Sequence, residues 1–163
     1  MIRFELSTHI HRPLSQVFAF VTTPENDFQW QYGTLATERV SNGEVGEGTL
    51  FRAVGHFLGQ RMERVFEVTR FERNKVYAHK SISGPLFSQT LYRFAILGAR
   101  TVLQVAVQLD PASSLGSVGL KNEKQVRNQY RQDLQLLRTV LETISSPPSP
   151  HLPSLEEPAG GSE

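Results

Sequence analysis

The sequence predicts an α+β domain in which an antiparallel sheet of about seven strands packs against one long helix near the C-terminus. From residue 34 to about residue 111, strand-like segments alternate with short turns, and no helical segment separates them. That arrangement is typical of an antiparallel meander rather than of parallel βαβ units. Near the C-terminus, apolar residues recur every three or four positions, which is the spacing of an amphipathic helix.

The first element is a strand over residues 2–10, where apolar and polar residues alternate. The period then changes to that of a helix, because four apolar residues fall at i, i+3, i+4 and i+7: Leu14, Val17, Phe18 and Val21. Thr23, Pro24 and Glu25 predict a second short helix, with the threonine as cap and the proline at the first helical position. It should end near Trp30.

Six further strands are predicted, each bounded by residues that favour turns. They cover residues 35–40, 49–57, 61–71, 75–82, 87–97 and 101–109. The long helix follows, with its apolar face formed by Val126, Tyr130, Leu134, Leu137, Leu141 and Ile144. We expect residues 1–145 to form one domain. Residues 146–163 are rich in proline and serine without apolar periodicity, so we expect a disordered tail.

The composition of the chain argues against several classes of function. The formal net charge is +1 and basic residues are not clustered, so no nucleic-acid partner is expected. The chain has no cysteine, which excludes disulfides and thiol catalysis and fits a cytoplasmic location. No apolar run approaches the length of a membrane span. His9 and His11 share a solvent-facing side of the first strand without a third ligand, so we expect no metal, and no cofactor is indicated.

Four stretches resemble the START and polyketide-cyclase superfamily, also called SRPBCC: VFAFVTTPENDFQW (17–30), GEVGEGTLF (43–51), FEVTRFERNKVYAHKSISGP (66–85) and LGARTVLQVAVQL (97–109). The resemblance covers residues 2 to about 144. It implies the helix-grip fold, in which a curved sheet wraps the C-terminal helix, two short helices close one end, and a cavity remains between sheet and helix. This fold hosts many functions.

Strand alternation gives candidate cavity residues. We predict apolar or aromatic ligand contacts from Trp30, Met62, Phe66, Tyr92, Phe94, Val105 and Tyr130. For the tryptophan and the tyrosines, plain core packing is the alternative that we favour.

Three side chains are the candidates for chemistry: His56, His79 and Arg64. The facing of both histidines is open, and we favour surface positions for them. Alternation turns Arg64 inward unless it lies at the sheet's end, and we favour an outer-face ion pair with Glu63 or Glu67.

Three functions remain open. The first, which we favour, is binding of a small hydrophobic molecule such as a lipid, isoprenoid, quinone or polyketide. The second is a polyketide cyclase or dehydratase activity, which needs inward-facing acid or base groups. The third is a regulatory or protein-interaction module with a residual cavity. The sequence shows no compact catalytic constellation, and this absence favours binding over catalysis.

Overall fold

The computed structural model describes residues 1–57, 59–84, 86–110 and 123–144. In this part of the chain the elements are β1 (Ile2–Ile10), α1 (Leu14–Val21), η1 (Pro24–Gln29), β2 (Thr34–Arg39), β3 (Leu50–Phe57), β4 (Gln60–Glu72), β5 (Val76–Ser83), β6 (Phe87–Leu97), β7 (Arg100–Asp110) and α3 (Glu123–Thr143). The predicted tail, residues 146–163, lies outside the described residues.

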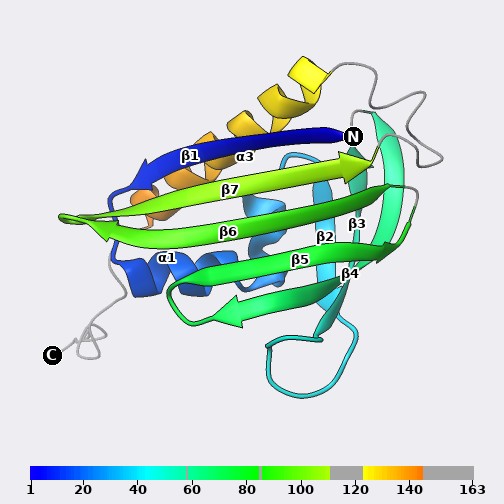
Figure 1. Ribbon diagram of the computed structural model, residues 1–163, viewed down its shortest axis with the longest axis horizontal. Coiled ribbons are helices and arrows are strands. Elements are labelled where there is room, and N and C mark those ends of the chain that lie inside the picture. The colour runs from blue at the N-terminus through cyan, green and yellow to red at the C-terminus, as the bar shows by residue number, and fades with distance from the viewer. Residues whose placement is uncertain (58, 85, 111–122, 145–163) are drawn as a thin grey trace, which may run out of the picture.

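All seven strands form one antiparallel sheet in the order β1-β7-β6-β5-β4-β3-β2 (Figure 1). Apart from β1, every strand pairs with its sequence neighbour, so the predicted meander is confirmed. β1 forms one edge of the sheet and pairs with β7 along its whole length, from Ile2 opposite Leu109 to Ile10 opposite Thr101.

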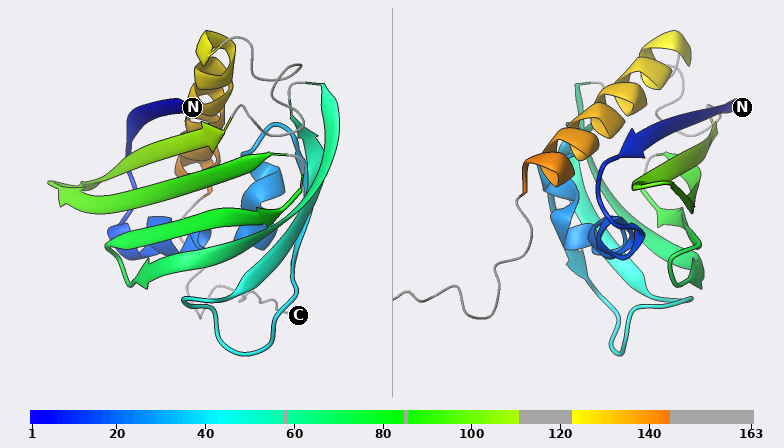
Figure 2. Two further views of the ribbon diagram at one scale, coloured as in Figure 1. Left: turned by 45° about the vertical axis from the view of Figure 1, so that its right-hand side comes forward. Right: turned by 90° about the vertical axis from the view of Figure 1, so that its left-hand side faces the viewer.

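The sheet curves, and α3 lies across its concave face (Figure 2). The helix buries the apolar face that its sequence predicts, with Val126, Leu134, Leu137 and Leu141 all withdrawn from solvent. Ile144 is 41% exposed, because it follows the last helical residue. The expected α+β helix-grip fold is confirmed.

Hydrogen bonds join the C-terminal end of α3 to the loop after β1. The Arg12 guanidinium donates hydrogen bonds to the carbonyl oxygens of Glu142 (2.5 Å) and Ile144 (2.7 Å). The His11 backbone N–H donates to the Glu142 carboxylate at 2.8 Å. The two Arg12 bonds satisfy carbonyls that a helix end otherwise leaves without partners.

The two short helices lie on the same side of the sheet as α3. α1 buries Val17, Phe18 and Val21, as the sequence predicts. The Phe18 ring meets Phe94 edge-on, with 5.0 Å between centroids, and thereby joins α1 to β6. No helix in the described part of the chain combines the length and the apolar character needed to cross a membrane.

The second short helix, η1, begins at Pro24 as predicted but is a 3-10 helix. Thr23 occupies the N-cap position as predicted, but its side chain makes no capping hydrogen bond. The Thr23 hydroxyl donates to the Ala19 carbonyl oxygen at 2.7 Å instead of accepting a bond from η1. A threonine just after a helix can donate to the carbonyl oxygen four residues earlier in this way. Trp30 ends η1 and is 3% exposed.

Candidate functional site

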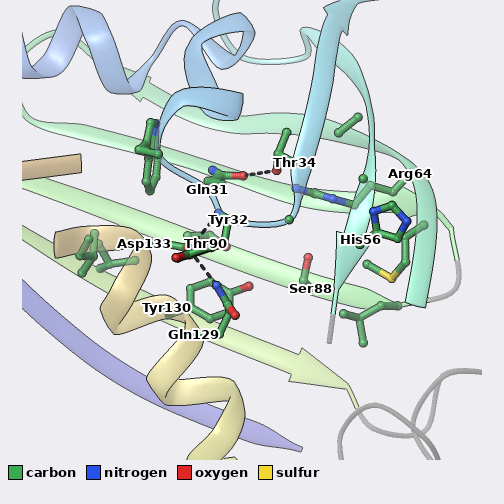
Figure 3. A pocket seen from close by; sticks show the side chains of 18 of the residues that line it. Gln31, Tyr32, Thr34, His56, Arg64, Ser88, Thr90, Gln129, Tyr130 and Asp133 are labelled. Atoms are coloured by element: carbon green, nitrogen blue, oxygen red, sulfur yellow. Dashed lines mark hydrogen bonds between the residues drawn. The ribbon is translucent and has the colours of Figure 1, made fainter. Parts of the chain in front are cut away.

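A cavity of about 280 Å³ lies between the concave face of the sheet and α3. Residues of all seven strands and of α3 line it, together with the segment that follows η1 (Figure 3). Tyr32 and His56 are lining residues whose side chains are exposed, so they mark the solvent side of the cavity.

The sheet contributes an apolar wall in register. Leu6 of β1 lies opposite Val105 of β7, which lies opposite Tyr92 of β6. All three line the cavity. The row continues to Tyr77 of β5, whose ring stacks on Tyr92 at 5.6 Å. A row of neighbouring side chains on one face of a sheet is a continuous surface, so a flat apolar molecule can lie on it.

At the mouth of the cavity, which is its solvent side near Tyr32 and His56, two glycines allow two backbone segments to approach closely. Gly33 and Gly55 both line the cavity, and the Gly33 carbonyl oxygen accepts the His56 N–H at 2.6 Å. A Cβ atom on Gly55 would lie 2.0 Å from the Gly33 oxygen, and a Cβ on Gly33 would lie 1.7 Å from the His56 oxygen. Only glycine permits this approach of the segment after η1 to β3.

The helix side of the cavity is more polar. Gln129, Tyr130, Asp133 and Leu134 of α3 line it. The Asp133 carboxylate accepts hydrogen bonds from the Tyr32 backbone N–H and the Gln129 side chain, each at 3.0 Å (Figure 3). Burial nevertheless raises the pKa of Asp133 to about 6. This carboxylate joins α3 to the segment at the cavity mouth.

His79 lies deep in the cavity wall. It is 8% exposed, and its ring lies 4.7 Å from the Phe66 ring and 6.0 Å from the Tyr92 ring, measured between centroids. Burial, with a smaller contribution from the Arg64 charge, lowers the pKa of His79 to about 3. Its Nδ1 atom is enclosed and has no hydrogen-bond partner among the described residues. The surface position that we favoured for His79 is wrong, whereas His56 is exposed as expected.

Arg64 reaches into the cavity from β4 (Figure 3). Its guanidinium carbon lies 4.9 Å from the centroid of the Phe66 ring, an orientation suited to a cation–π contact. The outer-face ion pair expected for Arg64 is wrong, because Glu63 approaches Arg61 instead and Arg64 faces inward. One guanidinium nitrogen, NH1, is buried and has no hydrogen-bond partner among the described residues.

The structure brings most of the predicted site residues to the cavity. Trp30, Met62, Tyr92, Val105, Tyr130, His56, His79 and Arg64 all line it. Phe66 and Phe94 are buried but are not lining residues. Phe66 lies behind the surface, stacked on Phe51, and Phe94 supports α1 through Phe18.

Several lining residues were missed from the sequence. Asp133 and Gln129 lie three or four positions from apolar residues of α3, and that spacing was a usable signal. Gly33 and Gly55 carry no local signal, because their role is a contact between segments far apart in the chain.

Comparison with known proteins identifies the family. No curated protein matches the chain in sequence. The fold is similar to that of a START superfamily protein from Mycobacterium smegmatis, with a TM-score of 0.75 and 15% identity over 87% of this chain and 98% of the other. It is also similar to the Zhui aromatase/cyclase from a Streptomyces species, with a TM-score of 0.68 and 15% identity over 86% and 93%. At 15% identity, these TM-scores show a shared fold alone.

The sequence itself matches the family described as "Polyketide cyclase / dehydrase and lipid transport" over residues 1–142. The matched part contains every described strand and both short helices, and it reaches to the last turn of α3. Since this match spans most of the 163 residues, the chain belongs to that family.

Proposed function

We propose that this protein binds a small, largely apolar molecule in the cavity between the sheet and α3. The observation that carries the proposal is the cavity itself, about 280 Å³ and walled by Leu6, Trp30, Tyr92, Val105 and Leu134. Ligand pockets for small molecules commonly measure about 300–1,000 Å³ and have apolar walls with a few polar groups. The size suits a compact molecule, such as a two-ring aromatic or a chain of medium length.

Three buried polar side chains of the cavity, His79, Tyr92 and Tyr130, are poorly suited to proton transfer. A general acid or base works best when its pKa lies near the working pH. The pKa of His79 is lowered to about 3, and burial raises the pKa of Tyr130 to about 12 and that of Tyr92 well above its ordinary value. These side chains therefore stay neutral at physiological pH and serve as hydrogen-bonding groups. The chain has no cysteine, and we place this binding function in the cytoplasm.

The experiment uses Trp30, which is the single tryptophan of the chain and lines the cavity. Its fluorescence should change saturably as decan-1-ol is added, with one molecule bound per chain. A filled-cavity variant, Ala53→Met, should lose this response, because Ala53 is a buried residue of the cavity wall. The matched control, Ala95→Met, adds the same side chain at an exposed position of β6 and should respond like the wild type.

The results separate the possible functions. An unchanged fluorescence signal in the wild type, together with no heat of binding, would contradict the proposal and favour an interaction module with a residual cavity. Equal binding by Ala53→Met and the wild type would place decan-1-ol outside the cavity.

A cyclase-like enzyme is the second candidate function. Arg64, His79 and Tyr92 line one cavity, and this grouping favours the candidate. One of the similar folds belongs to a protein described as an aromatase/cyclase. The test is product analysis with polyketide-like substrates. Turnover by the wild type that His79→Gln loses, by roughly 100-fold or more for a lost acid or base, would establish the enzyme and displace the binding proposal.

A further inference from the structure

We infer that the bound molecule carries one compact oxyanion, such as a carboxylate, and that Arg64 is its partner inside the cavity. This inference rests on the proposed function and adds the chemical class of the ligand. It follows from the way in which Arg64 is held, from the lack of a counter-charge for it, and from the small number of other polar groups that are free to bind.

The fold places the Arg64 guanidinium in the cavity. On β4 its side chain lies on the same face as Met62 and Phe66, and it pairs in register with Ala53 of β3. The Phe66 ring supports one face of the guanidinium. A cation–π contact of this kind uses the face of the guanidinium and does not itself satisfy the N–H donors at its edge. The NH1 nitrogen is enclosed, so water at the molecular surface does not satisfy it.

No carboxylate in the described part of the chain forms an ion pair with Arg64. Asp27 is close enough to influence it electrostatically, but burial raises the pKa of Asp27 well above its ordinary value and so favours the neutral acid. Asp133 lines the cavity, yet its hydrogen bonds go to Tyr32 and Gln129. The enclosed NH1 nitrogen of Arg64 therefore has neither a hydrogen-bond acceptor nor a counter-ion in the described part of the chain, and this is costly unless a bound anion supplies the acceptor.

The remaining polar groups indicate how much of the ligand is apolar. Among the described lining residues, two further side chains hold an enclosed polar atom without a partner, the Nε1 of Trp30 and the Nδ1 of His79. The sheet side of the wall has an apolar and aromatic row formed by Leu6, Tyr92 and Val105, while polar residues such as Thr90 and Gln129 line other parts of the cavity. A molecule with an apolar body and one anionic end matches this distribution.

The test compares two molecules that share a ten-carbon chain and differ in charge, sodium decanoate and decan-1-ol. Isothermal titration calorimetry at pH 7.5, below the aggregation concentration of each compound, gives both affinities. The wild type should bind decanoate roughly 10- to 100-fold more tightly, the range expected for a charge-assisted hydrogen bond. Arg64→Met should bind the two compounds about equally.

The matched control is Arg61→Met. Arg61 lies on the same strand three residues earlier, is exposed, and faces away from the cavity. This variant should keep the wild-type preference for decanoate. If Arg61→Met loses the preference as fully as Arg64→Met, the charge acts from a distance and the assignment to Arg64 is wrong.

The affinities of the wild type for decanoate and decan-1-ol are enough to test the inference. The test therefore does not depend on how well a variant folds. Equal affinities for decanoate and decan-1-ol would overturn the anionic class and leave the proposed function standing. Failure to bind either compound would overturn the proposed function and the inference with it. A decanoate preference that disappears in Arg64→Met would support both.

Discussion

Replacing Gly55 by alanine should disturb the solvent side of the cavity, where Gly55 of β3 lies against Gly33. The added Cβ would lie 2.0 Å from the Gly33 carbonyl oxygen and 2.9 Å from the Thr34 Cα. An ordinary contact needs about 3.4 Å, so the two backbones must separate by more than 1 Å. Both are backbone atoms, so no side-chain rotation can relieve the clash.

The energetic effect can be assembled from its parts. Overpacking of this kind costs roughly 1–3 kcal/mol. Separation of the backbones also breaks the 2.6 Å hydrogen bond from His56 N–H to the Gly33 oxygen, at about 1 kcal/mol. Alanine lowers the entropy of the unfolded chain and offsets about 0.4–1 kcal/mol. The free energy of unfolding should therefore fall by about 1–4 kcal/mol, combining these three contributions.

Urea denaturation followed by circular dichroism measures this loss. Gly46→Ala is the control, because a Cβ there meets no atom within 4 Å and the backbone is not left-handed. It should be neutral or slightly stabilising. The titration with decan-1-ol should also show weaker binding by Gly55→Ala, since Gly33 lines the cavity. Indistinguishable unfolding curves for the two variants would refute the close approach of Gly33 and Gly55.

Three further predictions concern the helix and the buried titratable groups. Leu137→Ala should lower the unfolding free energy by roughly 2–5 kcal/mol, because Leu137 is fully buried. Gln132→Ala, on the exposed face of α3, should lower it by under about 0.5 kcal/mol. Similar urea midpoints for the two variants would contradict the orientation of the helix. The pKa of Asp133 is raised to about 6 from an ordinary value of 3.8, so the folded state binds this proton more tightly, and Asp133 contributes stability as the pH falls from 6 toward 4. The Asp133→Asn variant should lack this gain, so the difference in unfolding free energy between wild type and variant should grow in favour of the wild type as the pH falls from 6 to 4. Parallel stability–pH curves for the two proteins would contradict the burial of the carboxyl. The pKa of His79 is lowered to about 3 from 6.5, so the unfolded chain takes up this proton first and His79 lowers stability as the pH falls from 6.5 toward 3. The NMR signals of its imidazole should not titrate between pH 8 and pH 5. A titration midpoint near 6.5 would show that the ring is exposed.

Much of the fold follows from local patterns. On β7 four apolar residues in steps of two could be assigned to one face from the sequence, and all four are buried: Leu103, Val105, Val107 and Leu109. The face of α3 was equally clear, because apolar residues keep helical spacing from Val126 to Leu141. These elements have one side against the core and one toward solvent, and that contrast is what periodicity detects.

The candidate site was harder to predict, for physical reasons. On β5 the four residues Val76–His79 are all buried, so hydrophobic alternation does not distinguish the cavity side of this strand. The pairing of β4 with β5 also shifts between Val68 and Arg70, and such a shift ends any simple face assignment along β4. His79 was therefore placed at the surface although it is buried. The contact between Gly33 and Gly55 arises only in the folded chain.

The most direct test of the central claim, that the cavity binds a small apolar molecule, is a crystal structure of the protein grown with decanoate. We predict electron density for one decanoate between the sheet and α3, with its chain against Tyr92, Val105 and Leu134. Its carboxylate should lie about 2.7–2.9 Å from the Arg64 guanidinium, the length of a charge-assisted hydrogen bond. Decanoate bound at another surface, with the cavity between Tyr92 and α3 empty, would contradict the account.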